Sequence, residues 1–164
     1  MLHLLIGPGK GKTSAAAGMA LRAAGRGLPV LFVQFLKDGA SGEVTALRRV
    51  QGVTVRHLPF HCGFTWEMTE EERRKIAAAC EALLEEAARS AAFLVVLDEA
   101  LHALAADLMT RESLERVLNR PGETVLTGYA APDWLKEKAD YISCIEKEKH
   151  PFDRGVQARA GVEF

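Results

Sequence analysis

The chain has 164 residues, of which 48% are hydrophobic and 26% charged, and its formal net charge is −1. This length favours one domain with a proper core, and the balanced charge excludes a basic nucleic-acid-binding surface or a tail of like charge. No apolar stretch reaches the length of a signal peptide or a membrane span, and the three cysteines, Cys62, Cys80 and Cys144, are widely spaced without a C-x-x-C pair. We therefore expect reduced thiols in a cytoplasmic protein, without a disulfide framework or a zinc site.

The first predicted strand, residues 2–6, runs into a glycine-rich loop and then into a helix expected over residues 12–24. The glycines let the backbone approach a ligand closely, while the helix start offers amides and a favourable dipole to an anion. A lysine here supplies charge for phosphate oxygens, and a threonine hydroxyl can bind Mg²⁺. The predicted phosphate-binding residues are Gly7, Pro8, Gly9, Lys10, Gly11, Lys12, Thr13 and Ser14.

This loop, G-P-G-K-G-K-T, has three residues between its first glycine and the Gly-Lys pair, whereas the usual P-loop has four. We expect the shortening to change how the loop wraps the phosphates. A plain glycine turn before a helix is the alternative, but the Gly-Lys-Thr placed between an apolar strand and an alanine-rich helix favours phosphate binding.

The second predicted strand, residues 30–35, is almost continuously apolar, as expected of a parallel strand buried on both faces. Gln34 and Lys37 lie at its end, where the sheets of α/β proteins present side chains that contact ligands. A turn containing Glu43 leads into a short helix through Leu47. An alternating pattern then predicts a strand over residues 53–58.

A long helix is expected to begin after Thr69, which with Glu72 has the spacing of a capping box, and to run to about Arg89. The next apolar run predicts a strand over residues 93–97, followed by a short helix and by another helix that Thr110 caps. Further elements are predicted at residues 124–127 (strand), 132–139 (helix) and 141–145 (strand), with a possible last strand from Val156 in the tail. The alternation predicts one α/β domain over residues 1–164, with helices on both faces of a mostly parallel sheet.

Asp98 and Glu99 follow the buried strand at 93–97 and have the form of a Walker B element. Asp98 is expected to hold Mg²⁺ opposite Thr13, directly or through water. Glu99 could assist the metal or, in an ATP hydrolase, orient water; the alternative for both acids is a helix N-cap with its first-turn carboxylate.

Residue chemistry alone says less about four other residues. Phe64 and Trp66 in G-F-T-W are aromatic residues in a loop, which most often fill a core, and Lys149 and His150 are most often surface groups. None of His3, His61 and His102 has a spacing that suggests a metal ligand.

Taken together, the motifs resemble the P-loop corrinoid adenosyltransferases of the cob(I)alamin or cob(I)yrinic acid a,c-diamide type. The resemblance covers nearly the whole chain. Its motifs, in order, are the short loop at 7–13, V-Q-F-L-K at 33–37, Gly42-Glu43, G-F-T-W at 63–66, V-V-L-D-E at 95–99, T-G-x-x-A-P at 127–132, Ala139-Asp140 and K-H-x-F-D-x-G-V-x-A-x-x-G-V at 149–162.

The resemblance implies a three-layer α/β/α P-loop NTPase fold of the RecA-like kind. It also implies a reaction in which a four-coordinate Co(I) corrinoid attacks C5′ of ATP and inorganic triphosphate leaves, in adenosylcobalamin biosynthesis or salvage. The implied catalytic residues are Lys12, Phe64, Trp66 and Glu99, with Phe64 and Trp66 excluding the lower axial ligand of cobalt. Gln34, Lys37, Glu43, Tyr129, Lys149, His150 and Phe152 are implied contacts on the corrinoid side or in its loops.

ATP, Mg²⁺ and the corrinoid are the implied small-molecule partners. A homodimer and an electron-donating reductase or flavodoxin-like protein are implied as protein partners, with no nucleic acid and no membrane. The chain departs from the family's pattern at Tyr129, where an arginine is common, and at Cys144 and Glu146, where glutamate and arginine are frequent. It also begins at its first strand, whereas some relatives carry an N-terminal extension over the site.

Two other functions stay open at this point. One is a P-loop kinase or ATPase acting on the γ-phosphoryl group, although no arginine-rich lid segment is present. The other is a non-catalytic protein for which ATP is a switch. Triphosphate, ADP or unchanged ATP as the product would distinguish the three.

Overall fold

The computed structural model describes residues 1–60, 62 and 68–163. Its sheet contains β1 (Leu2–Ile6), β2 (Val30–Gln34), β3 (Val53–His57), β4 (Leu94–Asp98), β5 (Glu123–Thr127) and β6 (Tyr141–Cys144). The strand order is β3-β2-β4-β5-β1-β6, and each neighbouring pair is parallel. The expected α/β fold is confirmed, and the mostly parallel sheet is parallel throughout.

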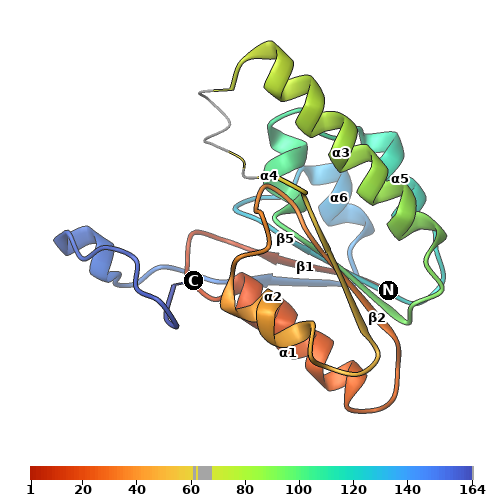
Figure 1. Cartoon of the computed structure of the whole chain (residues 1–164), viewed down its shortest axis with the longest axis horizontal. Helices are drawn as coiled ribbons and strands as arrows, with labels where there is room; N and C mark the ends of the chain where they lie inside the picture. The colour runs from red at the N-terminus through yellow and green to blue at the C-terminus, as the bar shows by residue number, and fades with distance from the viewer. Residues whose placement is uncertain (61, 63–67, 164) are drawn as a thin grey trace.

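Helices cover both faces of this sheet (Figure 1). One face carries α1 (Lys12–Ala24) and α2 (Gly42–Leu47), and the other carries α3 (Glu70–Arg89), α4 (Ala100–Ala105), α5 (Arg111–Leu118) and α6 (Asp133–Lys138). Two apolar cores lie between these layers, one on each face of the sheet. The result is the three-layer α/β/α arrangement expected of a P-loop NTPase-like fold.

The sequence explains the local structure of the main helices. The buried residues of α1 are all alanines, so this helix can lie close to the sheet. Thr69 and Glu72 form both hydrogen bonds of the predicted capping box at the start of α3. Because α1 and α4 begin soon after β1 and β4 end, the N-termini of both helices lie at the carboxyl edge of the sheet.

Strand order decides which chain segments meet at that carboxyl edge. β5 lies between β1 and β4, so the end of β5 separates the glycine loop after β1 from Asp98 at the end of β4. The expected strand and helix boundaries agree with the observed ones to within about one residue.

The tail differs from its expected structure. It contains the 3₁₀ turn η1 (Pro151–Arg154), which stands away from the sheet in Figure 1, and no strand begins at Val156. The physical reason is local: the amides of Val162 and Glu163 both donate to the carbonyl of Arg159, so the chain turns instead of extending. Among the described residues, no helix is long and apolar enough to cross a membrane.

Candidate active site

The glycine loop after β1 packs tightly against the chain that follows β5 and β6. The amide of Gly7 donates to the carbonyl of Tyr129 at 2.8 Å, and that of Gly9 donates to Ile145 at 2.7 Å. A side chain on Gly9 would come within 2.6 Å of the Ile145 oxygen, which explains the glycine. These two amides are therefore used within the protein, and the amides at the start of α1 are the donors left for an anion.

The two lysines of the loop have different surroundings. Lys12 Nζ donates to the carbonyl oxygens of Gly7 and Gly9, both at 2.7 Å, so its charge lies over the loop. Lys10 is exposed, and its Nζ lies 3.9 Å from Glu163 Oε1 in the tail. Gly11 has φ of 113° and caps α1, a conformation that glycine adopts without strain.

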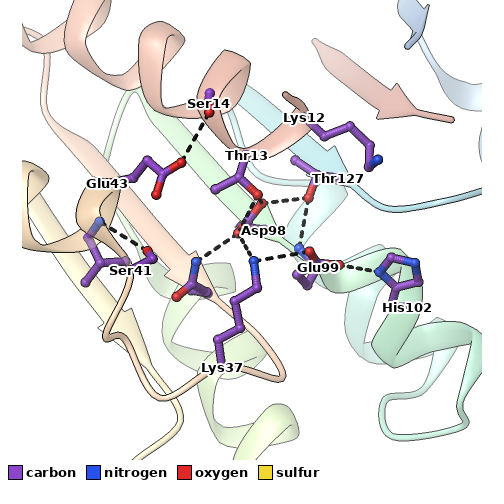
Figure 2. Close-up of polar contacts among 12 residues, drawn as sticks. Lys12, Thr13, Ser14, Lys37, Ser41, Glu43, Asp98, Glu99, His102 and Thr127 are labelled. Atoms are coloured by element: carbon purple, nitrogen blue, oxygen red, sulfur yellow. Dashed lines mark hydrogen bonds and ion pairs between the residues drawn. The ribbon is translucent and has the colours of Figure 1, made fainter. Parts of the chain in front are cut away.

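Asp98 is the centre of a polar cluster at the carboxyl edge (Figure 2). Thr13 Oγ1 lies 3.0 and 3.3 Å from its two carboxylate oxygens, and Gln34 Nε2 donates to Oδ2 at 3.0 Å. Thr127 Oγ1 donates to Oδ1 at 2.7 Å, and Lys37 Nζ lies 3.9 Å from Oδ2. The predicted meeting of Thr13 and Asp98 is thus present in the structure.

Burial has two consequences at this cluster. Asp98 is fully buried, which raises the pKa of its carboxyl, although Lys37 and the hydrogen bonds from Gln34 and Thr127 act in the opposite direction. Gln34 is also fully buried, and its Oε1 has no hydrogen-bond partner among the described residues. Gln34 therefore presents one fixed donor to Asp98, while its buried oxygen lacks a partner among the described residues.

Glu99 has a left-handed backbone with φ of 60°, unusual for a residue other than glycine. Its amide donates to Thr127 Oγ1 at 2.9 Å, Lys37 Nζ lies 3.3 Å from Oε1, and His102 Nδ1 contacts Oε2. Burial opposes ionisation of Glu99, but the hydrogen bond with His102 and the charge of Lys37 outweigh it and lower the pKa to about 2.

A pocket of about 240 Å³ opens beside the cluster. It lies between the start of α1, the loop after β2 and the tail. Its lining residues are Thr13, Leu36, Lys37, Asp38, Ala40, Ser41, Glu43 and Glu163. Ser14 Oγ donates to Glu43 Oε1 at 3.2 Å, which ties α1 to α2 at the rim of this pocket.

The oxygen atoms of Thr13 and Asp98 are suitable ligands for Mg²⁺. Thr13 and Asp98 supply hard oxygen ligands, which this ion prefers, and they approach each other from two different elements. Within the described ranges no three His, Cys, Asp or Glu side chains form a metal cage. A pair of protein oxygens suits Mg²⁺ in a nucleotide site, because the substrate phosphates and water complete its coordination.

Comparison with known proteins decides what kind of P-loop protein this is. A family model described as ATP:corrinoid adenosyltransferase BtuR/CobO/CobP matches residues 1–164. The chain belongs to the ATP:corrinoid adenosyltransferase family. Among its relatives are the corrinoid adenosyltransferase CobA of Salmonella typhimurium, 36% identical over all of this chain and 85% of that protein, and the corrinoid adenosyltransferase of Pseudomonas aeruginosa, 39% identical over 96% and 80%. The Escherichia coli K12 corrinoid adenosyltransferase is 35% identical, over 100% of this chain and 85% of the relative.

Membership of the ATP:corrinoid adenosyltransferase family supports the enzyme class expected from the motifs, with ATP and a corrinoid as substrates. It does not favour the kinase, ATPase or switch alternatives. The geometry of the loop and of the Asp98 cluster agrees with ATP as a substrate, and the family identifies the reaction.

The structure groups only part of the predicted site. Gln34, Lys37, Thr13 and Asp98 meet in one cluster, and Glu43 lines the adjoining pocket. Phe64 and Trp66 lie outside the described residues. Lys149, His150 and Phe152 lie in and beside η1, which stands away from the sheet in Figure 1, and Tyr129 is 60% exposed beside the glycine loop.

Three residues of the site were missed by the sequence reasoning. Thr127 gave a signal, because it closes a predicted strand at the carboxyl edge. His102 is three residues after Glu99, a spacing that brings side chains together once the helix is known. Glu163 gave no signal, because the fold of the tail brings it to the pocket.

Proposed function

We propose that this chain transfers the 5′-deoxyadenosyl group of ATP to the Co(I) of a corrinoid and releases inorganic triphosphate. The corrinoid would be cobalamin or cob(I)yrinic acid a,c-diamide, and the reaction would serve adenosylcobalamin biosynthesis or salvage. The observation that carries the proposal is the contact of Thr13 with buried Asp98 beside the shortened loop, in a chain of this family.

In this reaction the electron pair of Co(I) forms the new bond to C5′, while the bond from C5′ to O5′ breaks. Triphosphate leaves with the electrons of the broken bond, so no protein base is needed to create the nucleophile. The protein instead stabilises the charge of the leaving group and positions C5′. Lys12, Lys10 and the amides at the start of α1 are the groups that would bind the triphosphate.

Thr13 Oγ1 and the Asp98 carboxylate would hold Mg²⁺, and Gln34 and Thr127 orient that carboxylate. The ion, when bound, neutralises charge on the triphosphate oxygens. Glu99 lies next to this position and would act on the metal's surroundings or on the substrate.

The corrinoid side of the site follows from the family resemblance. Phe64 and Trp66 would exclude the lower axial ligand of cobalt, and the proposed contacts around the corrinoid remain Gln34, Lys37, Glu43, Tyr129, Lys149, His150 and Phe152. We also propose a homodimer, an electron-donating reductase or flavodoxin-like partner, and a cytoplasmic reaction.

The test is anaerobic incubation of the protein with Mg-ATP and chemically reduced cob(I)alamin or cob(I)yrinic acid a,c-diamide. We expect the Co(I) absorption band to disappear as light-sensitive adenosylcorrinoid forms. Lys12→Ala and Asp98→Asn should each lower the rate strongly, whereas Lys136→Ala, at an exposed position of α6, should leave it unchanged. If neither corrinoid is alkylated while ATP binds, the proposed function is wrong.

A further inference from the structure

The carboxylate of Glu99 is held at both of its oxygens. Lys37 Nζ lies 3.3 Å from Oε1, and His102 Nδ1 contacts Oε2 (Figure 2). Lys37 comes from the loop after β2 and His102 from the first turn of α4, so the two contacts come from different elements. Glu99 is thereby fixed between them.

The backbone adds to this restraint. Glu99 is in the left-handed region, and its amide is bound to Thr127 Oγ1 at 2.9 Å. Leu36, which precedes Lys37, is also left-handed with φ of 57°. Such conformations cost free energy in residues other than glycine, and they persist where the surrounding structure holds them. The contact between Lys37 and Glu99 is therefore held by strained backbone at Glu99 and at Leu36, the residue before Lys37.

A glutamate in the position of Glu99 carries a risk for an adenosyltransferase. In ATP hydrolases an acid after the Walker B aspartate orients a water molecule toward the γ-phosphate. The water oxygen bonds to the γ-phosphorus, the bond from this phosphorus to the β–γ bridging oxygen breaks, ADP leaves with that oxygen, and the water proton passes to the base and then to solvent. This hydrolysis would consume the ATP that adenosyl transfer needs intact.

We propose that Lys37 and His102 are positioning residues that turn the Glu99 carboxylate away from such a water and so suppress ATP hydrolysis. This inference rests on the proposed function, because it concerns which bond of ATP the site breaks. It assigns to this chain's own His102 a role in reaction specificity. A carboxylate with both oxygens already in contact with side-chain nitrogens lacks the free geometry needed to orient a water molecule.

His102 is the better residue for a test. Lys37 also lies 3.9 Å from Asp98 and lines the pocket, so its replacement would disturb the metal position as well. The side chain of His102 is 43% exposed, and its hydrogen bond within the described structure is to Glu99. His3 offers a matched control, because it pairs with Glu123 at 2.7 Å at the opposite end of the sheet.

The experiment measures ADP release from Mg-ATP without corrinoid, for the wild type, His102→Leu, His102→Asn and His3→Leu. We expect His102→Leu to raise ADP release at least about tenfold, which is below the roughly 10²–10⁴-fold that a fully positioned acid–base group supplies. Asn places an amide nitrogen near the position of Nδ1, so His102→Asn should restore most of the suppression. His3→Leu should equal the wild type.

The double variant Glu99→Gln with His102→Leu identifies the group that is released. If the freed carboxylate orients the water, the added hydrolysis disappears in this double variant. Circular dichroism and thermal unfolding confirm that each variant is folded. The inference is overturned if folded His102→Leu releases ADP at the wild-type rate, or if the added hydrolysis survives Glu99→Gln.

The results of this experiment can be distinguished from a failure of the proposed function. Adenosylcorrinoid formation by the wild type tests the transfer reaction. This test uses no variant of His102. A wild type that alkylates no corrinoid overturns the proposed function, whereas ADP release in the variants tests the restraint on Glu99 alone.

Discussion

Thr127 holds Asp98 through a 2.7 Å hydrogen bond from its hydroxyl to Oδ1, and both residues are buried. The same hydroxyl accepts the amide of Glu99 at 2.9 Å. One side chain at the end of β5 therefore fixes both acids of the neighbouring strand end. Strand order makes this possible, because β5 lies between β4 and the strand that carries the glycine loop.

Replacing Thr127 by valine keeps the shape of the side chain and removes its hydroxyl. The Glu99 amide loses its acceptor and Asp98 loses a donor, and a buried group left without its partner costs about 1–3 kcal/mol. We expect half-saturating Mg²⁺ to rise roughly tenfold, as for other residues that orient a metal ligand. The measurement is a Mg²⁺ titration of adenosyl transfer at saturating ATP.

Thr127→Ser provides the control for this variant, because it keeps the hydroxyl and loses only a methyl group. Its Mg²⁺ dependence should stay close to that of the wild type. An unchanged Mg²⁺ requirement in Thr127→Val would show that Thr127 stabilises the fold without orienting Asp98.

Gly9 is expected to tolerate no side chain. A Cβ there would lie 2.5 Å from the Glu146 oxygen and 2.6 Å from that of Ile145, both backbone atoms that cannot move aside. Gly9→Ala should lower the free energy of unfolding by about 1–3 kcal/mol, as overpacking does, and should weaken ATP binding. Thermal unfolding and equilibrium binding of a fluorescent ATP analogue measure the two effects.

Gly18, in α1, serves as the matched control, because a Cβ added there would meet no atom within 4 Å outside the helix's own backbone. Gly18→Ala should stabilise the protein by up to about 1 kcal/mol, because alanine favours helix. Equal stability of the Gly9 and Gly18 variants would contradict the packing of the loop on the chain after β6.

Much of this fold could be predicted because its signals are local. The apolar runs that become β2 and β4, the glycine loop and the capping box at Thr69 each depend on adjacent residues. The pairing of Thr13 with Asp98 could also be expected, since both follow strands of one parallel sheet. His102 was not predicted as a site residue, because its role depends on the left-handed turn at Glu99.

The tail could not be predicted for a different reason. Alternation after Val156 favours a strand, but Arg159 and Glu163 bond to each other through side chain and backbone and close a turn. Such long polar side chains give no periodic signal. The approach of Glu163 to Lys10 was therefore visible only in the structure.

Glu163 should compete with the triphosphate. Its carboxylate lies 3.9 Å from Lys10 Nζ and lines the pocket beside Thr13, so it places negative charge where phosphate oxygens would approach. We expect Glu163→Gln to lower the Kd for Mg-ATP a few-fold, with the larger effect at low salt. Isothermal titration calorimetry at two salt concentrations measures this change.

Asp153→Asn is the control for Glu163→Gln. Asp153 lies in the same tail, its Oδ1 is 2.9 Å from Lys147 Nζ, and it does not line the pocket. This substitution should leave the Kd unchanged. Weaker ATP binding by Glu163→Gln would instead mean that Glu163 holds Lys10 in its binding position.

The three thiols are expected to differ in reactivity. Cys144 is exposed, and a hydrogen bond from Sγ to Glu146 Oε1 at 2.9 Å raises its pKa, since it stabilises the protonated thiol. Burial raises the pKa of Cys80 to about 12, and Cys62 is also buried. Only the thiolate is alkylated, so Glu146→Gln should lower the pKa of Cys144 and speed its alkylation at about pH 8.

Mass spectrometry of protein treated with iodoacetamide measures these rates at each cysteine. In the wild type the alkylation rate of Cys144 should keep rising with pH beyond the pH at which an ordinary thiol is already ionised. Cys80 should stay unmodified in the folded protein. An equal or slower Cys144 rate in Glu146→Gln would contradict the effect assigned to the carboxylate.

Adenosyl transfer breaks the bond between C5′ and O5′ of ATP and leaves the phosphate chain intact, which separates it from every phosphoryl-transfer reaction. The most direct measurement is phosphorus NMR of the products during anaerobic turnover with reduced corrinoid, alongside the amount of adenosylcorrinoid formed. We expect inorganic triphosphate in equal amount to adenosylcorrinoid, with little ADP. ADP and inorganic phosphate in proportion to turnover, without triphosphate, would contradict the proposed reaction.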